Sequence, residues 1–374
     1  PGWGEFKLRG AYGQSGRAPG AFDAVRTWTP EGLAGVPAFV PENVGNDQIG
    51  PEVTTEFETG FDATWLNNRL STAFTYYNQK TNDALFNVPQ LPSNGFSNSQ
   101  LTNIGEIKNT GIEVQIDGTV FESATWGLNL GLNVSTNKSE IVSLDDPSLE
   151  TACFKEGYPL FARCNAKIAN PDQIVNDFDE VEYIMPGDPG YQGDGTNENE
   201  FLYGPNLPTT FISPSLTVSM PYGISVSARG DYKGGFYMDE QMYAVGRSVR
   251  SPICFPYYEN PQTSNAVKDN IPAEWMARCG NTARQEGYMW DASYFKLRSV
   301  SAAIPLNGIM PEGFNNSVLT LAVNNSFLWM KEMPFMDPET SQNPGGPGEA
   351  QQGYGFAETL PPSVSFRAAL RINF

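Results

Sequence analysis

The closing segment SVSFRAALRINF, residues 363–374, decides the fold. Its even positions carry apolar side chains: Val364, Phe366, Ala368, Leu370, Ile372 and Phe374. Its odd positions carry mostly polar side chains: Ser363, Ser365, Arg367, Ala369, Arg371 and Asn373. Successive side chains of a β-strand point to opposite faces, so the segment predicts a strand with one apolar and one polar face. The apolar face could contact lipid or the core of a soluble sandwich.

The same period of two recurs along the chain, as is typical of strands rather than helices. Residues 125–135, for example, alternate large apolar side chains with small and polar ones. The pattern predicts ten strands, near residues 4–13, 54–66, 69–84, 104–120, 124–142, 209–220, 224–238, 292–305, 317–330 and 363–374. The apolar phase slips at Arg298–Ser299, which predicts a β-bulge there.

The connections between these strands alternate between long and short. The short ones cover residues 66–68, 121–124, 221–223 and 307–316. The long ones cover residues 14–53, 85–103, 143–208, 239–291 and 331–362. Outer-membrane barrels have this asymmetry, with short periplasmic turns and long extracellular loops. The sequence therefore favours an all-β, antiparallel, up-and-down transmembrane β-barrel whose C-terminal Phe374 lies in the aromatic girdle at the periplasmic rim.

The composition excludes several classes of protein. The 374 residues include no apolar run of the roughly 18 residues that a membrane-spanning helix requires. A formal charge of −19 argues against a nucleic-acid surface, which would need a basic patch. The chain has no histidine, so it cannot form a Ser-His-Asp triad or a histidine-ligated metal site. No nucleophile–base pair, phosphate-binding glycine loop or haem motif is visible, so no enzymatic activity and no catalytic or cofactor-binding residue are predicted.

Four cysteines fall as two local pairs within predicted loops, without the spacing of a zinc site. Two disulfides in an oxidising compartment are favoured over free thiols. Of the three connectivities, the most local joins Cys153 to Cys164 and Cys254 to Cys279.

Several blocks resemble the C-terminal half of a TonB-dependent outer-membrane receptor, most closely the SusC/RagA-like group. They are FKLRGAYGQSGRAP (6–19), NDQIGPEVTTEFETGFDATWLNNRLSTAFTYYNQKTNDAL (46–85), NIGEIKNTGIEVQI (103–116), PGDPGYQGDGTNENEFLYGPNLPTTFISPSLTV (186–218), ASYFKLRSVSAAIPL (292–306) and LPPSVSFRAALRINF (360–374). Each block is weak alone, and their common order is specific.

The resemblance implies a 22-stranded barrel with an N-terminal plug, energised through TonB. Residues 1–374 would then be the C-terminal part of the barrel, with its last ten strands. The plug is absent from this sequence, so we expect the missing plug and strands in the same longer polypeptide or in a second chain. A closed ten-stranded barrel is the alternative.

The loop GDPGYQGDGTNENE carries oxygen ligands of the kind that Ca²⁺ prefers. The candidate calcium ligands are Asp188, Asp194, Asn197 and Glu200. The spacing does not match an EF-hand, and a solvated acidic turn is the alternative. No other cofactor is expected.

Side chains on the polar phase of the strands should face the barrel lumen. Arg229 and Asp231 spell an adhesion tripeptide with Gly230, but the alternation directs them, with Lys233, into the lumen. Arg367 and Arg371 share this face in the last strand, and further lumen candidates are Lys7, Arg9, Glu56, Glu58, Glu113, Asp117 and Lys296.

Aromatic side chains in the long loops could stack on sugar rings or aromatic ligands, or simply pack the loops together. The candidates are Trp28, Tyr257, Tyr258, Trp275 and Trp290.

The function expected from the resemblance is TonB-dependent uptake of a large nutrient, a glycan or a peptide, across the bacterial outer membrane. The expected partners are the TonB complex, a SusD-like surface lipoprotein lid, and lipid or lipopolysaccharide. Alternatives are a siderophore or vitamin receptor, a structural or adhesive surface protein assembled from receptor-like strands across chains, and a secreted β-sandwich glycosidase.

Overall fold

The computed structural model describes residues 3–33, 35–88, 99–145, 150, 153–189, 191, 201–239, 254–260, 262, 266–279, 289–306, 317–332, 337–340 and 362–372. Among these residues, no helix is long and apolar enough to cross a membrane.

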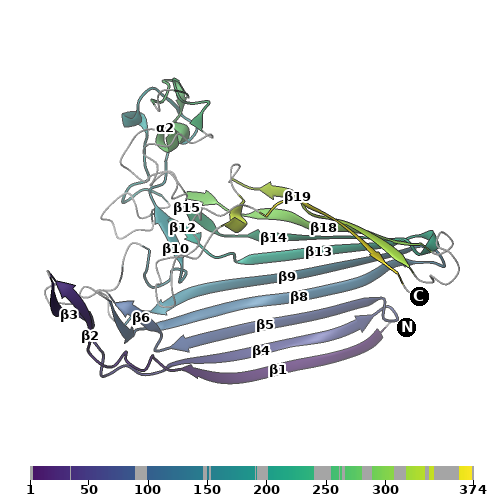
Figure 1. Cartoon of the computed structure of the whole chain (residues 1–374), viewed down its shortest axis with the longest axis horizontal. Coiled ribbons are helices and arrows are strands. Elements are labelled where there is room, and N and C mark those ends of the chain that lie inside the picture. Colours follow the sequence, from purple (N-terminus) through teal and green to yellow (C-terminus); the bar gives the residue numbers. More distant parts are fainter. Residues whose placement is uncertain are drawn as a thin grey trace.

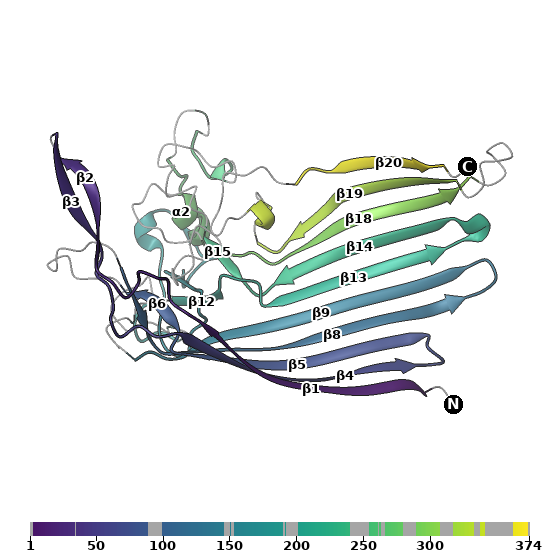
Figure 2. The same cartoon turned by 60° about the horizontal axis from the view of Figure 1, so that its bottom comes forward.

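Ten antiparallel strands form one continuous curved wall (Figures 1 and 2). In spatial order the strands are β1 (Trp3–Arg17), β4 (Glu52–Trp65), β5 (Leu70–Asn82), β8 (Glu106–Glu122), β9 (Gly127–Ser143), β13 (Thr210–Ser219), β14 (Ser225–Gly234), β18 (Tyr294–Pro305), β19 (Val318–Met330) and β20 (Ser365–Arg371). Each strand pairs with the next one along the chain, and β1 and β20 lie at the two edges. The structure thus confirms the ten predicted strands and their up-and-down order.

One face of the wall is apolar and exposed. The register aligns Leu8 of β1 with Phe61 of β4, and Phe61 with Phe74 of β5. The face continues across Val114, Val134 and Ile212. It ends on β20, where Phe366 and Leu370 are 82% and 54% exposed. An exposed apolar face of this extent marks contact with a partner or a membrane. We call it the outer face.

The opposite, inner face is polar, and its side chains alternate with those of the outer face. The register shows one interruption where expected: Arg229 faces Ser299 while Gly230 faces Leu297, so Arg298 is the extra residue. The register with β19 is interrupted at the same level, where Asn325 and Ser326 of β19 lie opposite Arg298 alone. This is the predicted β-bulge.

The short turns lie at one end of the wall, where β1 begins and β20 ends (Figure 2). One of these turns contains the 3₁₀ helix η5 (Pro221–Gly223). In the hairpin turn from β4 to β5, Leu66, Asn67 and Asn68 adopt positive φ angles. Asparagine tolerates this left-handed backbone better than most residues, which suits LNN to a tight turn.

The long loops lie at the other end and have secondary structure of their own (Figure 1). The loop strands are β2 (Thr27–Leu33), β3 (Val36–Asn43), β6 (Leu85–Val88), β7 (Gln100–Asn103), β10 (Ala162–Asn165), β11 (Ile174–Val175), β12 (Phe201–Pro205), β15 (Tyr237–Asp239), β16 (Ile271–Pro272) and β17 (Met289–Asp291). The loop helices are η3 (Phe178–Glu180), α2 (Ala273–Cys279) and η7 (Pro338–Thr340).

The two longest loops fold together. Strand β11, from the β9–β13 loop, pairs with β16, from the β14–β18 loop. Buried Val175 and Val181 of the first loop share a hydrophobic cluster with Ile271 and Met276 of the second. Most of the buried apolar residues lie in such loop clusters rather than in the wall. We call the unit built from these two loops the loop cap.

Candidate functional site

The inner face carries the predicted lumen side chains in one polar surface. Register places Lys7 opposite Asp62 and Arg9 opposite Gly60, on the face that also holds Glu56 and Glu58. Arg9 forms an ion pair with Asp62 at 3.0 Å and donates to the hydroxyl of Thr75 at 3.2 Å.

This surface continues across the next strands as a cleft of about 360 Å³. Glu113 and Gln115 of β8, Asn133 and Ser135 of β9, and Ser213 of β13 contribute to its lining. The cleft offers both donors and acceptors of hydrogen bonds, so it suits a polar ligand or a polar protein surface.

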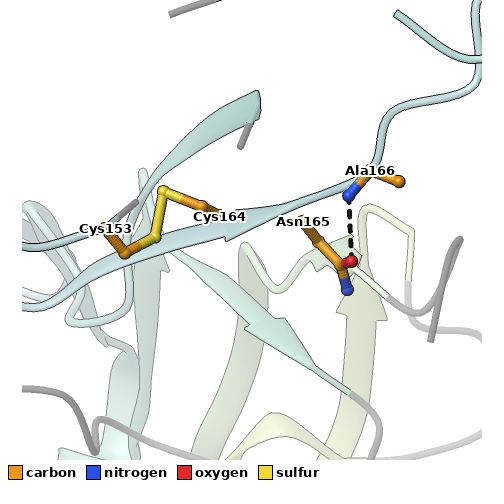
Figure 3. Close-up of a disulfide and its surroundings, with 4 residues drawn as sticks. All are labelled: Cys153, Cys164, Asn165 and Ala166. Atoms are coloured by element: carbon orange, nitrogen blue, oxygen red, sulfur yellow. Dashed lines mark hydrogen bonds between the residues drawn. A yellow bond between two sulfur atoms is a disulfide. The ribbon is translucent and has the colours of Figure 1, made fainter. Parts of the chain in front are cut away.

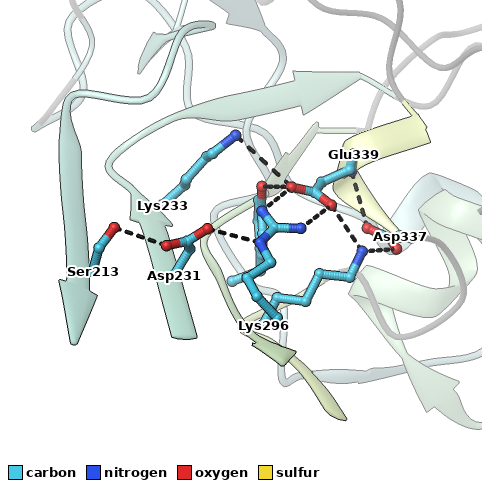
Figure 4. A network of polar contacts seen from close by, with 8 residues as sticks. Ser213, Asp231, Lys233, Lys296, Asp337 and Glu339 are labelled. Carbon is cyan, nitrogen blue, oxygen red and sulfur yellow. Dashed lines mark hydrogen bonds and ion pairs between the residues drawn. The ribbon is translucent and has the colours of Figure 1, made fainter. Parts of the chain in front are cut away.

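An ionic cluster joins the inner face to the last long loop (Figure 4). Lys296 of β18 donates its ammonium to Asp337 Oδ2 at 2.6 Å and to Glu339 Oε2 at 2.8 Å. Its side chain is only 2% exposed. Asp337 directly precedes η7, and its Oδ1 accepts the backbone N–H of Glu339 at 3.0 Å. We call this attachment of residues 337–340 the clasp.

Arg298, the bulge residue, links two carboxylates in the same cluster. Its Nε donates to Asp231 Oδ2 at 2.8 Å, and its terminal nitrogens donate to both oxygens of Glu339. Ser213 donates to the other oxygen of Asp231 at 2.8 Å. Arg298 keeps the inward phase of Lys296, and because of the bulge the following Ser299 lies on the inner face as well, opposite Arg229.

Glu339 is the centre of the clasp. It also accepts the hydroxyl of Tyr294 at 2.9 Å, and Lys233 approaches it at 3.8 Å. Burial raises the pKa of Glu339, but hydrogen bonds from Arg298, Lys296 and Tyr294 outweigh burial and hold the pKa well below its usual range. Glu339 is therefore ionised at neutral pH.

A second anchor lies beside the clasp at the loop end of the wall. Lys331, which follows β19, donates to Asp291 Oδ2 at 2.5 Å, and the backbone N–H of Ser293 donates to Asp291 Oδ1 at 3.0 Å. Burial raises the pKa of Asp291, but the bonds from Lys331 and Ser293 prevail, and the pKa is lowered.

Both predicted disulfides are present. Cys153 and Cys164 are joined with Cα atoms 5.5 Å apart, and beside them Asn165 Oδ1 accepts the backbone N–H of Ala166 (Figure 3). Cys254 and Cys279 are joined with Cα atoms 5.6 Å apart. The second bond ties the C-terminal end of α2 to the chain before Tyr257, so it closes part of the loop cap.

Four of the five loop aromatics pack within the loop cap or at its base. Tyr257 stacks on Trp275 with ring centroids 4.7 Å apart. Tyr258 is 4% exposed, and Trp290 is 6% exposed beneath the guanidinium of Arg278. Trp28 is different: it lies on the β2–β3 hairpin and is 51% exposed. Ligand contact by these aromatics stays a prediction.

The candidate calcium loop is described in part. The Oδ2 atom of Asp188 accepts the backbone N–H of Met185 at 2.8 Å, which closes a turn. The other candidate ligands, Asp194, Asn197 and Glu200, lie outside the described residues. Calcium binding stays a prediction.

The RGD tripeptide follows the predicted alternation. Arg229 and Asp231 share the inner face, and Lys233 lies on the same face opposite Tyr294. Arg367 lies opposite Ala322 of β19, and Arg371 lies opposite Val318. Both β19 residues face inward, so the two arginines lie on the inner face as well.

The clasp could not be predicted from the sequence, because Asp337 and Glu339 lie in a long loop without periodicity. The predicted bulge at Arg298 was the available signal.

The chain matches a protein-family model. The model described as "TonB dependent receptor-like, beta-barrel" matches residues 1–325.

Among curated proteins, the chain is similar to a TonB-dependent receptor of Formosa agariphila, at 25% identity over 87% of this chain and 36% of the relative. It is also 32% identical to the TonB-dependent receptor SusC of Bacteroides thetaiotaomicron, over 26% of this chain and 10% of that protein. The chain thus spans little more than a third of the length of the curated relatives that match most of it.

Among solved structures, the RagAB peptide transporter matches with a TM-score of 0.72 at 18% identity, covering 100% of this chain and 41% of the other. The RagAB peptide importer in its closed-closed state matches with a TM-score of 0.74 at 19% identity, with the same coverage. At these identities the match supports the fold.

Proposed function

Because the chain belongs to the TonB-dependent receptor-like β-barrel family, we propose that it forms part of the barrel wall of an outer-membrane receptor that imports a large nutrient, a glycan or a peptide. The observation that carries this proposal is the two-sided wall. An outer face with exposed Phe366 and Leu370 suits contact with acyl chains. An inner face with Arg9, Glu113 and Asp231 suits a hydrated passage.

The wall as described has two strand edges, at β1 and β20. An unpaired strand edge is not tolerated in hydrocarbon, where each free N–H and C=O costs several kcal/mol. We propose that further strands pair with both edges in the membrane, rather than that β1 closes on β20. We propose that they, and a plug inside the barrel, come from the remainder of the same polypeptide, in keeping with the greater length of the relatives.

The proposed orientation has the short turns in the periplasm and the loop cap outside the cell. The two disulfides support it, because loops exposed to the exterior meet an oxidising environment and proteases. The proposed partners are TonB, as energy source, and a SusD-like lipoprotein over the loops. The chain contributes passage and recognition, and no chemical step is assigned to it.

Deletion of the gene, followed by growth on single nutrient sources, tests the proposal. We expect loss of growth on one class of oligosaccharide or peptide and unchanged growth on monosaccharides or amino acids. Restoration should require both the receptor and an active TonB. Unchanged growth on every polymer tested would contradict nutrient import, and loss of iron-limited growth alone would instead select a siderophore receptor.

A further inference from the structure

Three lysines interrupt the outer face near its loop end. The structure describes all ten wall strands, apart from the side chain of Trp3. Within these strands, the cations that register directs outward are Lys80, Lys108 and Lys138. They lie on three neighbouring strands, β5, β8 and β9, although the chain as a whole is strongly acidic.

The outer face changes character in steps along these strands. Lys80, Lys108 and Glu140 form one row near the loops, and Asn82 and Glu106 form the row beyond it. The next rows toward the turns are Asn78, Thr110 and Lys138, then Tyr76, Ile112 and Thr136, and then Phe74, Val114 and Val134. From the loops toward the turns, the outer face thus presents charged groups first, then hydroxyl groups and a phenol ring, and finally hydrocarbon side chains. The same sequence of environments is met on passing from lipid headgroup to acyl chain.

A groove of about 630 Å³ lies across these rows. Its lining includes Lys108, Lys138, Thr110, Thr136, Tyr76 and Ile112. The two ammonium groups and the hydroxyls of the threonines and the tyrosine can all donate hydrogen bonds. Such a set of donors matches the oxygens of a phosphate group.

The charges around the groove leave one cation uncompensated. Lys80 pairs with Glu106 at 2.6 Å, and Lys138 pairs with Glu140 at 2.7 Å. Lys108 is exposed and has no ion pair or hydrogen bond from its ammonium within the described part of the chain. Lys108 lies opposite Lys80 on one neighbouring strand and opposite Glu140 on the other. Three lysines against the two glutamates leave one positive charge in excess, which favours a further anion beside Lys108.

We propose that this groove binds the phosphate of a lipopolysaccharide molecule of the surrounding leaflet. Lys108 and Lys138 contact the phosphate, and the threonine and tyrosine hydroxyls donate to its oxygens. An acyl chain of the same lipid lies along Phe74, Val114 and Val134. The site is separate from nutrient passage, since it lies on the other face of the wall. It requires the wall to be embedded in a membrane with the loops toward the lipopolysaccharide leaflet.

Native mass spectrometry of the full-length receptor in detergent tests the site, with lipid A as the probe. Phosphorylated lipid A should bind, and lipid A freed of its phosphates should bind much more weakly. The double variant Lys108→Gln with Lys138→Gln should lose about 25-fold in affinity, since each surface lysine contributes about fivefold toward an anionic lipid. Lys108→Arg should keep the affinity.

Lys7→Gln is the matched control, because Lys7 is an exposed wall lysine on the inner face. It removes the same charge and should leave lipid binding unchanged. Equal binding of the two forms of lipid A, or undiminished binding by the double variant, would overturn the proposal. Displacement of the lipid by an equal concentration of inorganic phosphate would also overturn it, since the site would then hold a free anion. A heat-modifiable gel shift of each variant verifies that the barrel has formed.

Discussion

Lys296 and Asp337 form a buried ion pair that joins β18 to the last long loop. Lys296 Nζ lies 2.6 Å from Asp337 Oδ2, and the two side chains are 2% and 5% exposed. Because Glu339 of the same loop shares the ammonium, a short segment of loop is held against the inner face by several charges.

Lys296→Met should release the clasp. Removal of one partner of a buried pair leaves an uncompensated carboxylate and costs about 3–5 kcal/mol. We expect faster hydrogen exchange at residues 337–340, with little change in β8 and β9. Lys7→Met is the control, since Lys7 lies on the same face without burial. Unchanged exchange at residues 337–340 would mean that the clasp does not hold the loop.

The clasp should also depend on pH. The pKa of Glu339 is lower in the folded state than its ordinary value of 4.5. Its contribution to stability is therefore complete above pH 4.5 and is lost as the pH falls from there toward the folded-state pKa. Hydrogen exchange at residues 337–340, corrected for its intrinsic pH dependence, should show constant protection from pH 8 to 5 and a decline below pH 4.5. In Glu339→Gln this decline in protection should be smaller. A decline as large as in the unmodified protein would mean that another group causes the pH dependence.

The disulfide between Cys254 and Cys279 should stabilise the loop cap and not the wall. Its ends are 25 residues apart, and a closed loop of this length contributes about 3 kcal/mol through the entropy of the unfolded chain. The variant with both cysteines changed to serine should be cleaved faster by protease in residues 254–279, with an unchanged heat-modifiable gel shift. Loss of the gel shift would show that the wall depends on the cap.

Two neighbouring residues of β9 should differ in how much an added charge destabilises the folded barrel. Leu132 faces outward opposite Ile116, whereas Asn133 faces inward opposite Gln115. Leu132→Lys should destabilise the folded barrel by about 2–4 kcal/mol, the cost of a lysine on the lipid face near the bilayer midplane. Asn133→Lys should cost much less, because water reaches the inner face. Reversible unfolding by urea in lipid vesicles measures both, and equal losses would contradict the assignment of the faces.

The sequence predicts the wall well, because alternation is a local signal and each strand repeats it many times. The phase slip at Arg298 even locates the bulge. Strand ends are less well predicted. The predicted first strand ends at residue 13, because GQSGR has no apolar alternation, whereas β1 continues to Arg17. Its hydrogen bonds to β4 extend the strand despite this composition.

The loop contacts could not be predicted. The pairing of Val175 with Ile271 joins segments almost 100 residues apart, and no local pattern distinguishes these residues from other loop aliphatics. The clasp is unpredictable for the same reason, because the partners of Glu339 lie on β18, a strand distant in the sequence. The burial of the aromatics Tyr258 and Trp290 likewise depends on partners that are distant in the sequence.

The two-sided wall is tested most directly by spin labels placed one at a time at residues 364–371 of the receptor in lipid vesicles. The four cysteines of this chain are joined in disulfides, so a cysteine added to this chain can be labelled selectively within it. We predict that labels at even positions, including Phe366 and Leu370, collide mainly with dissolved oxygen, which concentrates in lipid. Labels at odd positions, including Arg367, should collide mainly with a water-soluble nickel complex. Uniform accessibility along the strand, or alternation with the opposite phase, would contradict the account.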